Sequence, residues 1–262
     1  MTVPDAITLL SLEIYRVATT FFSKPEQLKR LDACPQEFQG WRSLGGEFSV
    51  VPERPDLHES FWVTGTDGDH LFSRFSSEAR RLHELLADYA RQISGLERLL
   101  TAEIMRSLGV DGHASFECVS RSDIQCLFYR PSTHQDREFL QEEHEDAVYM
   151  TLTKADAPGL EVECKGGSYR PLSLQPNQIA VLPGEILSLM TGGFIRPLMH
   201  RVVRNASQEV RTTIGYFLAP TAIDGGKIEP WISNAFNASI NLEQRVRDNQ
   251  VKFLVRGEGI DN

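Results

Sequence analysis

Three segments in the second half of the chain decide the fold: HEDAVYMTL at 144–152, PLMHRVV at 197–203 and RTTIGYFLAP at 211–220. Each combines β-branched or aromatic residues with alternating polar and apolar positions, which is typical of β-strands. Further strand-like runs lie at 124–129 and 179–182, and Gly, Pro and Asn separate these runs. Many short strands with turn residues between them predict two sheets packed face to face, as in a jelly roll.

The N-terminal part of the chain has helical patterns instead. Apolar residues recur at helical spacing from Ile7 to Phe22, and Pro25 follows the end of this pattern. A long amphipathic helix is predicted from 77 to Gly109, because glycine commonly follows a helix C-terminus. Between these helices, residues 35–76 are rich in Gly and Pro, so we expect only short regular elements there.

We therefore predict an α+β protein with a double-stranded β-helix, or jelly-roll, core at residues 115–221. An N-terminal helical and loop region at 1–114 is predicted to pack on one sheet of this core. A polar C-terminal tail at 222–262, with a helix near 240–254, is predicted to cover the mouth of the cavity as a lid. We expect the three parts to form one structural unit.

Composition and charge limit the classes of partner. The 262 residues carry a formal net charge of -9 with scattered basic residues, so nucleic acid is a poor candidate. The sequence contains no run of about 18 apolar residues, which a membrane-spanning helix would need, and the N-terminus does not resemble a secretory signal. The four cysteines form no C-x-x-C pair, which argues against a zinc cluster. We expect a cytoplasmic protein, and the sequence does not indicate its oligomeric state.

A candidate metal site follows from two of the strand-like segments. One intervening residue on an extended chain puts His144 and Asp146 on the same face, and His200 follows 56 residues later in another β-type segment. Two imidazoles and one carboxylate leave coordination positions open, as in ferrous oxygenases. The same alternation predicts that Glu143 and Glu145 face away from this site.

A candidate anion site follows from the third segment. Alternation places Arg211 and Thr213 on one face of the strand, where they offer a guanidinium fork and a hydroxyl group. This pair suits a carboxylate ligand.

At this point the chain resembles a known family, the iron(II)/2-oxoglutarate-dependent dioxygenases related to isopenicillin N synthase. Besides the three segments above, the resemblance is carried by FFSKPEQLKRLD at 21–32, PDLHESFWV at 55–63, LFYRP at 127–131 and GLEV at 159–162. It implies that His144, Asp146 and His200 hold Fe(II). It also implies that Arg211, Thr213 and Tyr129 bind 2-oxoglutarate, and that GLEV opens a hairpin on the cavity wall.

The resemblance further implies an activity. A small organic molecule would be oxidised with O2, by hydroxylation, desaturation or cyclisation, while 2-oxoglutarate is converted to succinate and CO2. The chain departs from the family pattern at Leu127, Val148 and Pro197, where relatives commonly have asparagine, glycine and serine. From the resemblance we also expect the usual opening strand to be missing before the first helix. No metal ligand is lost by these departures.

The substrate itself is not encoded in a readable pattern. Position relative to the family's pocket gives five candidate substrate-binding residues: Trp41, Arg42, Phe61, Phe139 and Phe217. Two alternatives stay open, an Fe(II) oxidase on the same scaffold that does not use 2-oxoglutarate, and a jelly roll that binds a metal or small ligand without catalysis. A zinc hydrolase could use the same three ligands, but no general base stands at a recognisable place.

Overall fold

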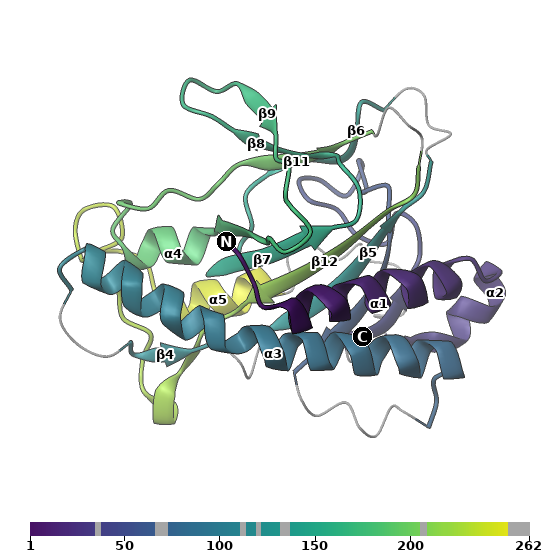
Figure 1. Cartoon of the computed structure of the whole chain (residues 1–262). Helices are drawn as coiled ribbons and strands as arrows, with labels where there is room; N and C mark the ends of the chain where they lie inside the picture. Colours follow the sequence, from purple (N-terminus) through teal and green to yellow (C-terminus); the bar gives the residue numbers. More distant parts are fainter. Residues whose placement is uncertain are drawn as a thin grey trace.

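Two antiparallel sheets face each other in the computed structural model (Figure 1). The structure describes residues 1–34, 38–65, 73–110, 114–118, 122–131, 137–204 and 209–250. The larger sheet has seven strands, in the spatial order β1 (Ala33–Cys34), β2 (Gln39–Arg42), β3 (Glu59–Thr64), β5 (Asp123–Tyr129), β12 (Arg211–Leu218), β7 (Met150–Ala155) and β10 (Ala180–Pro183). The smaller sheet has four strands, in the order β6 (Phe139–His144), β11 (His200–Val203), β8 (Leu160–Glu163) and β9 (Tyr169–Pro171).

Two long helices cover the outer face of the larger sheet. The helices are α1 (Asp5–Phe22), α2 (Glu26–Lys29), α3 (Ser77–Ser107), α4 (Glu185–Met190) and α5 (Leu242–Gln250), and a two-stranded sheet joins β4 (Phe116–Glu117) to β13 (Thr221–Ala222). Among the described residues, 3-10 helices are η1 (Arg30–Asp32) and η5 (Ile223–Gly225). The helix α1 packs against α3, and both contact the sheet at β5 or β12 (Figure 1). The predicted α+β class with a jelly-roll core is confirmed.

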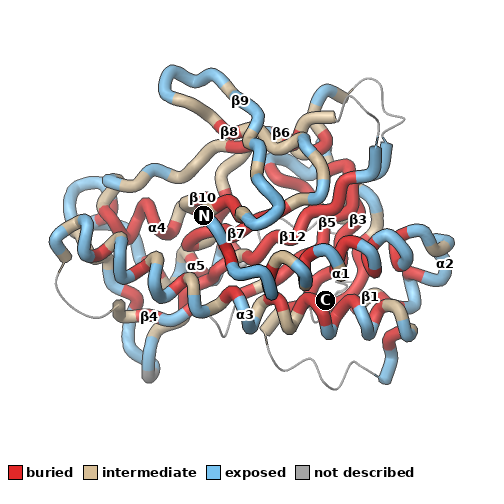
Figure 2. Tube along the Cα trace, in the orientation of Figure 1, coloured by how far each residue is buried: buried red, intermediate tan, exposed pale blue. Residues whose placement is uncertain are grey.

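Side chains alternate between the two faces of the larger sheet. On β5, Ile124, Cys126 and Phe128 belong to the core that the helices cover, whereas Gln125 and Leu127 line a cavity on the opposite face. Figure 2 shows these strands buried, with exposed residues concentrated on the outward sides of α1 and α3. One face of the sheet therefore supplies the hydrophobic core, and the other face supplies the walls of the cavity.

The long helix has the boundaries that its sequence predicts. Ser76 caps the N-terminus, where its side chain accepts a hydrogen bond from the backbone N–H of Ala79. At the other end Gly109 has φ +66°, a left-handed conformation that glycine adopts at little cost. The helix predicted from the first apolar pattern is also confirmed, as α1. No helix within the described ranges is both long and apolar enough to cross a membrane.

The first residues of the chain complete an edge of the larger sheet. Thr2 forms an antiparallel bridge with Gln178, just before β10, and the backbone N–H of Val3 donates to the carbonyl of Asn177 at 2.9 Å. The other edge is extended by β1, β2 and β3, which come from residues 33–64. The predicted N-terminal region thus contributes strands to the sheet as well as helices. The proposed division at residues 114 and 221 stays a prediction.

The C-terminal helix α5 packs against α4. Arg245 forms an ion pair with Glu185, and the side-chain amide of Asn249 donates to the carbonyl of Ala147 at 2.7 Å. Val246 and Asn249 also line the cavity. The helix predicted near 240–254 is confirmed up to residue 250, and the rest of that range is outside the described residues. Its role as a lid stays a prediction.

The turn from β10 into α4 leaves no room for a side chain at Gly184. A Cβ atom there would lie far inside van der Waals contact with the carbonyl oxygen of Val148 and 2.9 Å from that of Asp146. The backbone N–H groups of Glu185 and Ile186 donate to these same two carbonyls. The start of α4 therefore fixes the backbone of residues 146–148.

We predict that Gly184→Ala destabilises the fold, because the new methyl group displaces this backbone. The expected loss in the free energy of unfolding is about 1–3 kcal/mol, measured by urea denaturation. Gly95→Ala is the matched control: a Cβ at Gly95 meets nothing within 4 Å, so this change in α3 should be neutral or stabilising by up to about 1 kcal/mol. Equal stability of wild type and Gly184→Ala would contradict the close approach.

Candidate metal centre and cavity

A cavity of about 160 Å³ lies on the face of the larger sheet opposite the one that α1 and α3 cover. Since one water needs roughly 10–15 Å³ of such space, the cavity has room for a small organic molecule. Its walls come from β3, β5, β7 and β12 of the larger sheet and from β6, β8 and β11 of the smaller one. Residues predicted from the sequence as metal or co-substrate ligands meet here: His144, Asp146, Tyr129, His200, Arg211 and Thr213.

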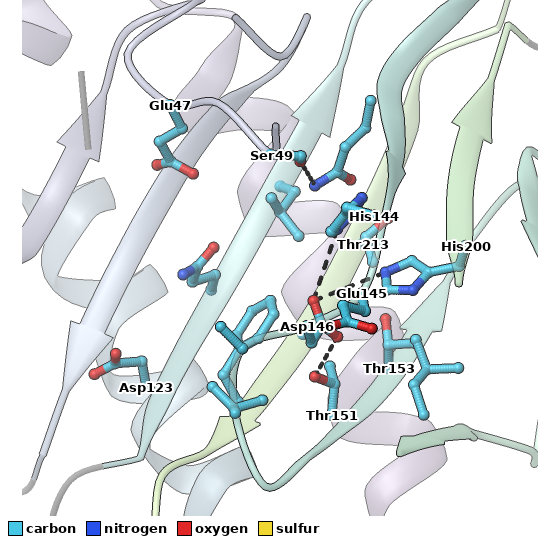
Figure 3. Close-up of a pocket in the computed structure, with 18 of the residues that line it drawn as sticks. Glu47, Ser49, Asp123, His144, Glu145, Asp146, Thr151, Thr153, His200 and Thr213 are labelled. Atoms are coloured by element: carbon cyan, nitrogen blue, oxygen red, sulfur yellow. Dashed lines mark hydrogen bonds and ion pairs between the residues drawn. The ribbon is translucent and has the colours of Figure 1, made fainter. Parts of the chain in front are cut away.

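The three predicted metal ligands converge. Strand β11 pairs with β6 so that His200 lies opposite His144, and Asp146 follows two residues after the end of β6. The Oδ1 atom of Asp146 is 3.7 Å from Nε2 of His144 and 3.8 Å from Nε2 of His200 (Figure 3). These separations suit donors that each lie about 2.0–2.2 Å from one shared ion.

Backbone and side-chain hydrogen bonds orient all three donors. Nδ1 of His144 is 2.7 Å from the carbonyl oxygen of Glu142, and Nδ1 of His200 is 2.9 Å from that of Leu198. Each Nδ1 must carry the proton to make this bond, so each Nε2 presents a lone pair to the site. The Thr151 hydroxyl donates to Oδ2 of Asp146 at 2.5 Å, which leaves Oδ1 facing the imidazoles.

The electrostatics favour a neutral imidazole at His144. Burial lowers the pKa of His144, and the adjacent His200 lowers it further, although Asp146 opposes both effects. The two rings lie 4.3 Å apart between centroids. A neutral imidazole can donate its Nε2 lone pair to a metal, so His144 is suited to bind a divalent cation.

Arg211 and Thr213 lie on the cavity face of β12, as alternation predicts. Nη1 of Arg211 donates to Oγ1 of Thr213 at 2.5 Å, and Nε is 3.3 Å from the carbonyl of Ala157. Arg211 is only 3% exposed, and no carboxylate among the described residues forms an ion pair with it. Burial lowers the pKa of its guanidinium, with Tyr129 and Asp156 acting against that shift. A buried guanidinium of this kind is suited to an anionic ligand.

Tyr129 lies directly across from Arg211 in the pairing of β5 with β12. The Arg211 guanidinium carbon is 5.1 Å from the centroid of the Tyr129 ring. The Tyr129 hydroxyl donates to Oε1 of Gln141 at 3.0 Å, and the Gln141 amide donates to Ser49. Burial raises the pKa of Tyr129 well above its usual range, so the phenol stays protonated and available as a donor.

Of the five predicted substrate-binding residues, only Phe217 lines the cavity. Trp41 and Phe61 are paired neighbours on β2 and β3, but their side chains belong to the helix-covered core. Phe61 is fully buried there, with its ring 5.3 Å from that of Phe21 on α1. Their place in the core indicates packing roles for both residues. The prediction failed because the sequence does not reveal which face of a short strand lines the cavity.

The other two candidates also lie away from the cavity lining. Phe139 packs against Arg201, whose guanidinium carbon is 4.5 Å from the centroid of the Phe139 ring. Arg42 lies on the cavity side of β2, but it is covered by Trp62, whose ring centroid is 4.5 Å from the guanidinium carbon. Trp62, one position along β3 from the predicted Phe61, does line the cavity.

The prediction that Glu145 faces away from the site is wrong. Glu145 lines the cavity and lies beside Asp146 and His200 in Figure 3. Strand β6 ends at His144, so the alternation of an extended strand does not continue through the next two residues. Glu143, inside the strand, does lie outside the cavity lining, near Arg201.

Sequence reasoning missed a group of polar residues in the cavity. Gln125 and Asp123 precede Tyr129 on β5 in the same phase, and Glu47 lies in the connection between β2 and β3. Residues two and four positions before a strand residue lie on the same face of the strand. The prediction that Tyr129 lines the cavity could therefore have been extended to Leu127 and Gln125. No comparable signal marks Glu47.

Comparisons with known proteins agree with this geometry. Residues 121–220 match the family model described as the 2OG-Fe(II) oxygenase superfamily. The 2-oxoglutarate-dependent dioxygenase FG08081 of Gibberella zeae is 23% identical over 218 residues, 79% of this chain and 65% of that protein. Protein SRG1 of Arabidopsis thaliana is 27% identical over 210 residues, 75% of this chain and 56% of that protein. The chain thus spans between about half and two thirds of the length of these relatives.

Solved structures share the fold. A full-length Neurospora crassa protein in complex with alpha-KG and thymine superimposes with a TM-score of 0.71 at 19% identity, over 92% of this chain and 83% of that chain. A putative 2OG-Fe(II) oxygenase family protein from Caulobacter crescentus gives a TM-score of 0.70 at 17% identity, over 92% and 85% of the two chains. The segment matched by the family model contains all three converging donors and the arginine beside them, so residues 121–220 are similar to the 2OG-Fe(II) oxygenase superfamily at the site itself.

Proposed function

We propose that the protein is an Fe(II)/2-oxoglutarate-dependent dioxygenase that oxidises a small organic molecule. One observation carries the proposal: two imidazoles and a carboxylate converge in the same cavity as a buried arginine that has no carboxylate partner among the described residues. The first group fits a ferrous ion with open coordination positions, and the second fits the carboxylate of a co-substrate. Hydroxylation, desaturation and cyclisation are all compatible with this site.

His144, Asp146 and His200 would hold the iron. When bound there, Fe(II) supplies the dioxygen chemistry that couples decarboxylation of 2-oxoglutarate, to succinate and CO2, to oxidation of the substrate. The protein's own contribution is to fix the donor atoms and to exclude water. The carbonyls of Glu142 and Leu198 fix the two rings, and Thr151 fixes the carboxylate.

Arg211 would bind the distal carboxylate of 2-oxoglutarate. Thr213 holds one guanidinium nitrogen, and Tyr129 lies against the guanidinium, so these two residues position the charge as well as offering hydroxyl groups. For Tyr129 to donate to the co-substrate, its hydroxyl would have to exchange the present bond to Gln141. The cytoplasmic location inferred from the sequence stays a prediction, to be tested by cell fractionation.

The runner-up is an Fe(II) oxidase that does not use 2-oxoglutarate. The buried Arg211 argues against it, because an oxidase of that kind has no need for a second anion site. A jelly roll that binds a metal or a small ligand without catalysis is the other alternative, and it has no need for a metal site and a buried arginine in one cavity.

The direct test is to mix purified protein with Fe(II), ascorbate and 2-oxoglutarate and to measure succinate, first without and then with a panel of small molecules. The proposal expects succinate that depends on Fe(II) and increases with a substrate. Asp146→Ala should abolish both succinate formation and iron binding. Oxygen consumption without any succinate would favour the oxidase instead.

Arg211→Ala should raise the dissociation constant for 2-oxoglutarate by about 30-fold or more, because loss of one partner of a buried charge pair costs roughly 2–5 kcal/mol. Isothermal titration under anaerobic conditions with Fe(II) present measures this constant. Arg16→Ala, on the exposed face of α1 where Arg16 pairs with Glu13, is the control and should leave it unchanged. Unchanged binding in Arg211→Ala would remove the co-substrate assignment and leave the metal assignment standing.

Thr151→Val should weaken iron binding by about 10–100-fold, because the Asp146 carboxylate loses the hydrogen bond that orients it. Thr153→Val is a matched control on the same face of the same strand: its hydroxyl donates to the carbonyl of Ile214 and does not contact Asp146. Competition with a chelator of known affinity measures both constants. Equal affinities in the two variants would show that Thr151 does not orient the ligand.

A further inference from the structure

The end of the cavity away from the metal donors has a wall of polar side chains that the proposed chemistry does not use. Gln125 and Asp123 come from β5, and Glu47 comes from the connection between β2 and β3. Figure 3 shows Glu47 and Asp123 on the opposite side of the pocket from His200. These three residues are called the polar wall below.

Gln125 is the centre of the polar wall. The residue is 7% exposed and lines the cavity. A ligand in the cavity can therefore reach its amide. An amide side chain offers one acceptor oxygen and two donor hydrogens side by side. Its best complement is a group with an adjacent N–H and C=O.

Aromatic rings flank this amide. Gln125 pairs with Trp62 on β3 and with Gly215 on β12. The absence of a side chain at Gly215 allows the Phe217 ring to fold over it, since a Cβ there would be 2.9 Å from that ring. Both Trp62 and Phe217 line the cavity. A flat, partly apolar ligand therefore fits this end.

The charges of the polar wall disfavour an anionic ligand. Glu47 accepts hydrogen bonds from Trp62 at 2.7 Å and from Ser60 at 2.5 Å through Oε1. The nearby cation, Arg42, is 3.8 Å from the same oxygen but lies behind Trp62, outside the cavity lining. A carboxylate placed beside Glu47 would therefore meet an acceptor rather than a free cation.

Asp123 adds a second acceptor to the polar wall. Its Oδ1 atom is shielded from solvent and has no hydrogen-bond partner among the described residues. Burial raises the pKa of this carboxyl to about 6, against the opposing charge of Arg42. Asp123 lines the cavity, so its carboxyl group can accept an N–H from a ligand.

We propose that Gln125, Glu47 and Asp123 recognise the substrate, and that the substrate is an uncharged, flat molecule with a carboxamide-type edge: a primary amide, lactam or cyclic imide. The Gln125 amide pairs with the adjacent N–H and C=O of this edge, and Glu47 or Asp123 accepts the remaining N–H. Carboxylic acids of the same shape are excluded by like charge. The inference rests on the proposed function for the identity of the site, but it concerns a different end of the cavity.

The test uses matched pairs of ring compounds that differ only in carboxamide against carboxylate: benzamide and benzoate, nicotinamide and nicotinate, and indole-3-acetamide and indole-3-acetate. Dissociation constants are measured by titration calorimetry with the protein, Fe(II) and 2-oxoglutarate under anaerobic conditions. We expect at least one carboxamide to bind at least about tenfold more tightly than its acid, a difference of about 1.4 kcal/mol. Gln125→Leu should remove this preference while leaving the constant for 2-oxoglutarate unchanged.

Gln92→Leu, on the exposed face of α3, makes the same chemical change away from the cavity and should behave as wild type. Tighter binding of the acids, no binding of any carboxamide, or an unchanged preference in Gln125→Leu would each overturn the inference. The dissociation constant for 2-oxoglutarate distinguishes failure of this inference from failure of the proposed function. A wild-type protein that binds Fe(II) and 2-oxoglutarate but prefers acids loses only the substrate assignment, whereas one that binds neither loses both.

Discussion

The pairing of β6 with β11 is the constraint on which the site depends. It places His200 opposite His144, although 56 residues separate them in the sequence, so both imidazoles lie at the same place in the cavity. Asp146 joins them because the backbone beyond β6 is held by the first turn of α4. A shift of one residue in this pairing would turn one imidazole to the other face of the sheet, and the three donor atoms would no longer converge.

The larger sheet divides stability and function between its two faces. Its helix side is apolar and closely packed, with aromatic contacts such as that of Phe61 with Phe21. Its cavity side has Arg211 and Thr213 at one end of the strands and Gln125 with Asp123 farther along. The buried polar groups on this side lower stability unless ligands pair with them, which is the arrangement expected of a binding site.

Local pattern is enough to predict the chemistry at one end of the cavity and not at the other. Alternation places Arg211 beside Thr213, and the H-x-D segment places His144 beside Asp146, because each signal lies within one strand or motif. His200 joins them only through the pairing of β6 with β11. Trp41 and Phe61 were predicted to line the cavity, but β2 and β3 present the opposite phase, which only their pairing with β5 determines. The prediction for Glu145 is wrong because β6 ends one residue earlier, and Gln125 carries no motif at all.

The central claim is that three side chains hold one ferrous ion. The most direct measurement is anaerobic titration of Fe(II) into wild-type protein and His200→Ala, with bound metal per chain determined by elemental analysis after gel filtration. The account predicts one tightly bound iron per wild-type chain and its loss in His200→Ala, with the fold retained by circular dichroism. One iron bound equally well by the folded variant would contradict it.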